Sequence, residues 1–81
     1  MTHVGKRLRE LRTRAGLKRE ELAVEAGVSY GVVAMIEANN TTDPKVSTLR
    51  KLARALARRQ GKREMEVLAE LLGEEEATHE A

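Results

Sequence analysis

The sequence predicts an all-α fold of four or five helices, and three observations support this class. Apolar residues recur at intervals of three and four, the periodicity of helices with one buried face. Glycine follows several of these patterns, where a left-handed residue would end a helix. Only Gly27-Val28-Ser29 separates the second pattern from the third, so these two helices must cross steeply. The expected helices cover about residues 4–15, 18–26, 29–38, 46–59 and 62–72.

The first expected helix, residues 4–15, has Leu8, Leu11 and Ala15 on one face and ends at Gly16. Its other side is basic, with Lys6, Arg7, Arg9 and Arg14. One face is therefore suited to a core and the other to water or an anion.

The second and third helices form a helix-turn-helix pattern. Leu22 and Ala23 lie on the inner face of the second helix, and the small Ala23 allows close packing. Gly27 can take the left-handed conformation that ends this helix, and Ser29 is suited to cap the next one. A rigid, steeply crossed pair of this kind is the geometry that places one helix in a DNA major groove. The third helix turns Val33 and Ile36 inward and presents four residues outward, Tyr30, Gly31, Ala34 and Met35.

Residues 39–43 form a turn-rich loop before Pro44, in which Asn39 or Asn40 can adopt a left-handed helix cap. The fourth helix follows, and Gly61 interrupts it. The fifth carries an apolar stripe of Met65, Leu68, Ala69, Leu71 and Leu72, and Gly73 ends it. This stripe either closes the core of the monomer or forms a dimer seam. Residues 1–73 are thus expected to be one domain, followed by an acidic flexible tail, residues 74–81.

The composition limits what this chain can do. The only aromatic residue is Tyr30, so the core must be aliphatic, and the absence of cysteine excludes disulfides and thiolate chemistry. No apolar run approaches the ~20 residues of a membrane span, and an apolar signal core is missing. We therefore expect a cytoplasmic protein without a membrane partner.

Charge is divided sharply along the chain. Residues 1–63 hold all 15 Lys and Arg against six acids, a net charge of +9, whereas residues 64–81 hold seven acids and no Lys or Arg, a net charge of −7. A basic body suits a polyanionic partner, and the acidic end would repel one. The acidic end should therefore lie away from any bound DNA.

The sequence resembles the phage Cro/repressor-like helix-turn-helix family, also called the XRE family. The matching segments are Gly5–Arg12, Ala15–Leu17, Glu21–Ala23, Ala26–Ser29, Ile36–Glu37, Pro44 and Thr48–Leu56. The resemblance implies a lambda-repressor-like domain that binds double-stranded DNA as a homodimeric transcriptional regulator, in most cases a repressor. It implies no cofactor.

In the resembled family the exposed positions of the third helix reach base edges, which assigns this role to Tyr30, Gly31, Ala34 and Met35. Family members often have Gln, Arg, Ser or Asn there, because direct readout relies on bidentate donors and acceptors. Here only Tyr30 can hydrogen-bond through its side chain. Base reading should therefore be modest, with a larger share for DNA shape.

The sequence offers more candidate residues for phosphate contacts than for base contacts. Lys18 and Arg19 open the second helix, whose amides also attract an anion. Other residues lie in or beside the loops that follow the DNA backbone in the family, and the full expected set is Lys18, Arg19, Ser29, Asn39, Asn40, Thr42 and Lys45. The family commonly pairs the positions of Arg12 and Glu37, which we expect to form a structural ion pair.

An enzyme is not expected. His3 and His79 lie at opposite ends, and no His, Cys or carboxylate cluster has metal-ligand spacing, so neither a catalytic nor a metal site is predicted. The alternative function is a helix-turn-helix protein-interaction module, antitoxin-like or docking on another partner through its apolar third helix and acidic end. A third idea is that residues 64–81 screen the basic surface as a DNA mimic.

Overall fold

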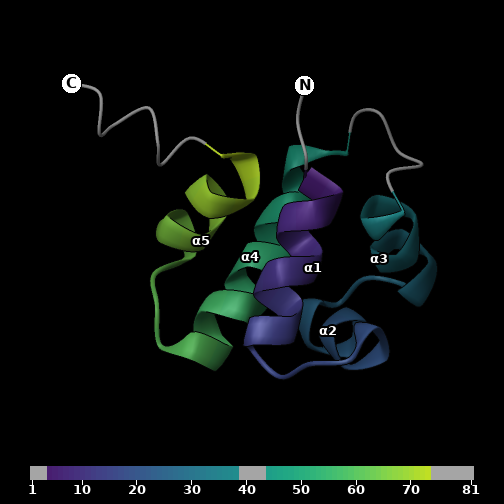
Figure 1. The fold of residues 1–81 in the computed structure, drawn as a ribbon, viewed down its shortest axis with the longest axis horizontal. Coiled ribbons are helices and arrows are strands. Elements are labelled where there is room, and N and C mark those ends of the chain that lie inside the picture. Colours follow the sequence, from purple (N-terminus) through teal and green to yellow (C-terminus); the bar gives the residue numbers. More distant parts are fainter. Residues whose placement is uncertain (1–3, 39–43, 74–81) are drawn as a thin grey trace.

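The computed structural model describes residues 4–38 and 44–73, and every regular element within them is an α-helix. In Figure 1, α1 and α4 overlap in the middle of the view, with α5 on one side of them and α2 and α3 on the other. The predicted all-α arrangement is confirmed, and each bound agrees within two residues. The helices are α1 (Val4–Arg14), α2 (Arg19–Ala26), α3 (Tyr30–Glu37), α4 (Val46–Gln60) and α5 (Glu64–Leu72).

The turn between α2 and α3 follows from two local interactions. Gly27 adopts a left-handed conformation with φ of 73°, and the amide of Val28 donates to the Ala23 carbonyl at 3.0 Å. Ser29 then caps α3, because its hydroxyl accepts from the Val32 amide at 3.2 Å. The two helices are therefore joined with little freedom in the connection.

The start of α5 was predicted two residues too early. Gly61 ends α4 with φ of 69°, and Arg63 has the extended backbone of an N-cap, with φ of −82° and ψ of 145°. Residues 62 and 63 therefore connect the two helices and do not begin the second one.

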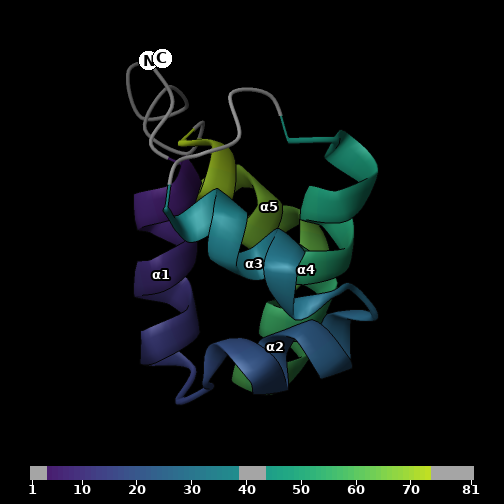
Figure 2. The same ribbon diagram turned by 90° about the vertical axis from the view of Figure 1, so that its right-hand side faces the viewer.

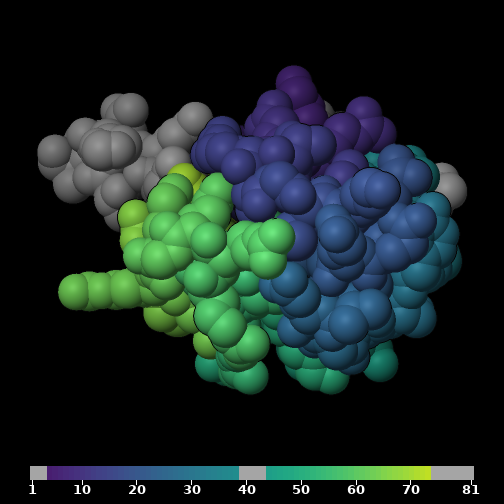
Figure 3. All heavy atoms as spheres, turned by 90° about the horizontal axis from the view of Figure 1, so that it is seen from below, coloured from purple at the N-terminus to yellow at the C-terminus, as the bar shows by residue number. Residues whose placement is uncertain are grey.

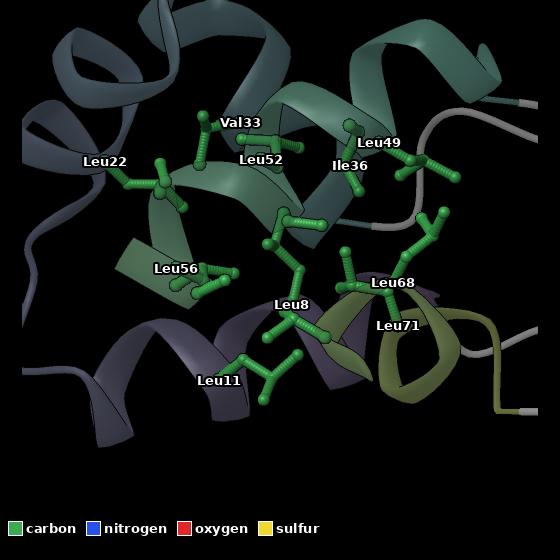
Figure 4. Close-up of a cluster of buried hydrophobic side chains, with 14 of the residues drawn as sticks. Leu8, Leu11, Leu22, Val33, Ile36, Leu49, Leu52, Leu56, Leu68 and Leu71 are labelled. Carbon is green, nitrogen blue, oxygen red and sulfur yellow. The ribbon is translucent and has the colours of Figure 1, made fainter. Parts of the chain in front are cut away.

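The core is aliphatic and draws on all five helices. Figure 4 shows leucines from α1, α2, α4 and α5 pointing toward one another, with Val33 and Ile36 of α3 beside them. α4 contributes the largest set of buried side chains, as expected for a central helix. The largest fully buried side chains are Leu8, Leu22, Leu52, Leu56, Leu71, Val33 and Val67.

The apolar stripe of α5 differs from the prediction in two positions. Leu68 and Leu71 are buried as expected, but Val67 is fully buried while Met65 is 68% exposed. Glu64, one residue earlier, is held by arginines of α4, which turns Met65 away from the core. Closure of the monomer core therefore uses Val67, Leu68 and Leu71.

The start of α1 crosses the end of α3 at backbone distance. Gly5 is buried, and a Cβ atom placed on it would overlap the Ile36 carbonyl oxygen and lie 3.2 Å from the Glu37 carbonyl oxygen. Only glycine fits this crossing without a shift of the backbone. This contact fixes α3 against the rest of the domain.

Candidate nucleic-acid interface

The exposed face of α3 is the surface on which the predicted base-facing residues meet. Tyr30 is 48% exposed and Met35 is 51% exposed, and Gly31 lies open between them along the helix. Ala34 differs from the prediction: it was expected to be exposed, but it is half-buried, next to the buried Val33. Figure 2 looks onto α3, with α1 and α4 on either side and α2 below.

The last turn of α3 is anchored by an ion-pair cluster around Glu37. The Glu37 side chain is fully buried, and Arg12 donates to it through Nε at 2.6 Å and through Nη2 at 3.1 Å. Arg12 Nη1 also donates to the Leu17 carbonyl at 2.9 Å. This bidentate arrangement ties α3 to both ends of the α1–α2 connection. The predicted partners Arg12 and Glu37 are thus brought together.

Two further arginines, which sequence reasoning did not assign to this cluster, lie near the same carboxylate. Arg19 Nε donates to Glu37 Oε1 at 3.0 Å, and Arg9 Nε lies 3.9 Å from the same oxygen. Separations of 18 and 28 residues leave no local spacing signal that could have revealed these contacts. Arg19 therefore has an internal partner in addition to its predicted role toward phosphate.

Arg19 also connects this cluster to the exposed face of α3. Hydrogen bonding to Tyr30 and then to Glu37 raises the pKa of Arg19 above its ordinary value. The side chain of Arg19 is 38% exposed. The Arg19 side chain can therefore hydrogen-bond to Tyr30 while part of it remains accessible to an anion.

The other phosphate candidates differ in their surroundings. Lys18, Ser29 and Lys45 are exposed, and each occupies the N-cap position of a helix. The positive end of α2 is already compensated, because Glu21 Oε1 accepts from the Lys18 amide at 2.7 Å and Glu20 lies in the same turn. This weakens the anion attraction expected of the α2 amides. Three of the predicted contacts lie outside the described residues, namely Asn39, Asn40 and Thr42.

α3 and α4, in contrast, begin without an acidic residue in the first turn. Their positive ends lie at Ser29 and Lys45, so they remain available to an anion. The starts of α3 and α4 thus lack the acidic compensation that Glu20 and Glu21 give to the start of α2.

A second exposed surface lies on α2. It is an open groove lined by Glu20, Glu21, Val24 and Glu25, in which Val24 is 81% exposed. Arg59 Nη1 lies 3.3 Å from Glu25 Oε2, so the end of α4 contacts this helix. Figure 3 shows the blue surface of α2 meeting the green surface of the α4–α5 segment on this side of the molecule. This surface is acidic and does not suit a phosphate.

The described residues contain no group of three or more His, Cys, Asp or Glu side chains able to hold a metal ion. Within residues 4–38 and 44–73, the helices lack the length and hydrophobicity that a bilayer crossing requires.

Comparison with known proteins identifies the fold. A family model described as helix-turn-helix matches residues 8–60, which include the α2–α3 turn, the α3 surface and the Glu37 cluster. The chain belongs to the XRE-type helix-turn-helix family. The resemblance predicted from the sequence is thereby confirmed.

One curated relative of this helix-turn-helix protein is an uncharacterized HTH-type transcriptional regulator, RghRB, from Bacillus subtilis (strain 168). The two are 39% identical over 56 residues, which are 69% of this chain and 40% of the relative. The matched region thus spans less than half the length of that protein. The comparison with solved structures gives no significant match. The family assignment rests on the helix-turn-helix model, which covers the region from α1 to α4.

Proposed function

We propose that this helix-turn-helix protein binds double-stranded DNA in a sequence-dependent manner as a homodimeric transcriptional repressor, with α3 in the major groove. The observation that carries the proposal is the exposed Tyr30–Met35 face of α3, a helix whose last turn is held by the buried Glu37 cluster. A helix that enters a groove must hold its orientation while its outer face stays free. The fixed crossing at Gly5 supports the same requirement.

Base recognition in this proposal centres on Tyr30. Its hydroxyl can donate to or accept from a base edge, and Met35 and Ala34 offer apolar contact to thymine methyl groups. Gly31 allows the backbone of α3 to approach the duplex closely. Few bidentate contacts are available, so DNA shape contributes to selectivity.

Phosphate binding in this proposal uses exposed cations and the uncompensated helix ends. Lys18, Arg19 and Lys45 supply the cations, and the amides at the starts of α3 and α4 supply donors. The sequence also predicts phosphate contacts for Ser29 and, outside the described residues, for Asn39, Asn40 and Thr42. Affinity should fall with salt, with a log–log slope of about −0.9 for each phosphate neutralised.

The proposed homodimer would present two copies of α3 to half-sites about one helical turn, roughly 34 Å, apart. A dimer seam on α5 would rest on Met65 and the half-buried Leu72, since Leu68 belongs to the core. Repression is proposed on family grounds, because a protein bound over a promoter blocks access to it.

The decisive experiment is selection from a random double-stranded DNA pool near physiological salt, with wild-type protein and Tyr30→Phe and Tyr30→Ala variants in parallel. We expect wild type to enrich a palindrome with half-sites one turn apart. Tyr30→Phe should relax the preference at one position of each half-site by removing the hydroxyl alone. Weak, salt-sensitive retention without enrichment would overturn sequence-dependent binding.

The composition of α3 favours a second candidate, a protein-interaction module. The outward side chains Tyr30, Ala34 and Met35 are largely apolar, and such a face loses little on desolvation by a partner helix. In this case a Met35→Glu variant would lose a protein partner and the pool selection would fail. The same selection therefore separates the two candidates.

A further inference from the structure

The end of α5 rests on an arginine of α1. A Cβ atom placed on Gly73, the residue that ends α5, would lie 3.0 Å from Arg7 Nη2, 3.1 Å from Cζ and 3.2 Å from Nε. The guanidinium is therefore packed against the backbone at this helix end. Figures 1 and 2 both show the end of α5 beside the start of α1.

The Arg7 guanidinium lies at a helix end where a positive charge is stabilising. The carboxyl end of a helix carries partial negative charge, and a cation there stabilises it. α5 has no basic residue in its own last turn, so Arg7 supplies the cation from another helix. The residues that follow Gly73 are Glu74, Glu75 and Glu76, whose charges would add to the negative end of α5.

Arg7 is also available for an additional carboxylate. It lines a cavity of about 150 Å³ between α1 and α5, together with Glu10, Leu11, Arg14 and Glu70. Among residues 4–38 and 44–73, no carboxylate oxygen lies within 4 Å of a guanidinium nitrogen of Arg7 or Arg14. Glu70 is instead 3.8 Å from Lys62 Nζ.

The acidic segment 74–81 is long enough to use this site. Eight residues span at most roughly 26–29 Å when extended, whereas the 11-residue α1 is about 16 Å long. The segment carries four glutamates and no Lys or Arg, and α1 presents Arg7 and Arg14 to the cavity beside α5. The first glutamate lies one residue from the Gly73–Arg7 contact.

We propose that the acidic segment 74–81 docks in cis on α1 beside the α1–α5 cavity, with Arg7 as the receptor for the glutamates of residues 74–76. The contact holds α5 to α1 and neutralises part of the positive charge of α1. It is independent of DNA and is tested without it.

The test is a double-mutant cycle on the full chain by thermal unfolding at low salt. The triple variant Glu74→Gln, Glu75→Gln, Glu76→Gln is made in the wild-type, Arg7→Gln and Lys6→Gln backgrounds. Lys6 is the matched control, because it is the exposed neighbour of Arg7 on the same helix. We expect the triple substitution to lower the midpoint by roughly 2–4 °C in wild type and in Lys6→Gln. In Arg7→Gln, and at 1 M NaCl in all backgrounds, the loss should disappear.

An equal loss in the Arg7→Gln background, or no loss in wild type, overturns the proposal. A coupling that grows with protein concentration also overturns it, because the segment would then dock on a second copy. If Arg7→Gln does not fold, the side-chain Nε–H signal of Arg7 in the NMR spectrum of the triple variant decides. The signal should move relative to wild type at low salt, and an unmoved signal rejects the contact.

Discussion

Gly5 and Gly31 are both helical glycines, but their surroundings are opposite. At Gly5 the backbone of α3 fills the space that a methyl group would need. We expect Gly5→Ala to lower the free energy of unfolding by about 1–3 kcal/mol, because α1 and α3 must move apart. Urea denaturation measures this loss. An unchanged midpoint would show that the crossing adjusts freely.

Gly31 has no such constraint within the described part of the chain, since the nearest atom to an added Cβ would be Ser29 Oγ at 3.9 Å. Alanine there should stabilise α3 by about 0.5–1 kcal/mol. If α3 approaches DNA closely at this point, Gly31→Ala should also weaken DNA binding. We therefore expect a higher unfolding midpoint together with a lower affinity in a binding titration. A gain in stability without any loss of affinity would remove Gly31 from the interface.

Glu37 is the residue on which the orientation of α3 depends. Its removal would leave Arg12 without its carboxylate, and breaking a buried pair in this way costs roughly 3–5 kcal/mol. Glu37→Ala should therefore lower the thermal midpoint strongly. Arg9→Ala is the control, because Arg9 is 57% exposed and 3.9 Å from the carboxylate. Comparable losses in the two variants would contradict a buried pair as the main source of stability.

Sequence reasoning found the α3 surface because Tyr30, Gly31 and Met35 fall outside the inward face that Val33 and Ile36 define in the helical period. It missed the contacts of Arg9 and Arg19 with Glu37, because an ion pair across 18 or 28 residues depends on how α1, α2 and α3 cross. The exposure of Ala34 was overestimated for a related reason. A helical wheel gives direction but not the width of the surface that neighbouring helices cover.

At the scale of helices, the ends were predictable wherever glycine and an apolar period agreed. Gly27 and Ser29 define the α2–α3 turn by their own backbone preferences. The start of α5 lacked such a signal, since neither Lys62 nor Arg63 has a side chain that caps a helix. Its true start is determined by a tertiary contact, the Glu64 carboxylate between Arg50 and Arg54.

That contact gives α5 a pH dependence. Arg54 and then Arg50 lower the pKa of Glu64 from its ordinary 4.5. A carboxyl with a lowered pKa adds stability above the pKa of the unfolded chain, and this is lost as the pH falls through the folded pKa. We expect Glu64→Gln to be less stable than wild type at pH 7 and equal to it in acid, as measured by urea midpoints. Glu66→Gln is the control, because Glu66 has no ion pair with any described residue. A constant difference at all pH values would contradict the assignment.

At the scale of the whole molecule, the division of charge affects any binding to DNA. Neutralising the four glutamates of residues 74–81 removes negative charge from a chain whose first 63 residues carry a net +9. We expect this variant to bind DNA roughly threefold to tenfold more tightly at low salt, and the gain to shrink as salt screens it. Titrations at several salt concentrations measure both effects. Equal affinity at low salt would dispose of electrostatic screening by this segment.

The aliphatic core has a practical consequence for spectroscopy. With no Trp or Phe in the chain, Tyr30 on α3 is the only aromatic side chain. Intrinsic fluorescence and near-ultraviolet circular dichroism therefore originate at one half-exposed position on the candidate interface, while the interior contributes none. The natural chain thus carries its own optical probe, and quenching during a titration would report occupancy of the α3 surface without any label.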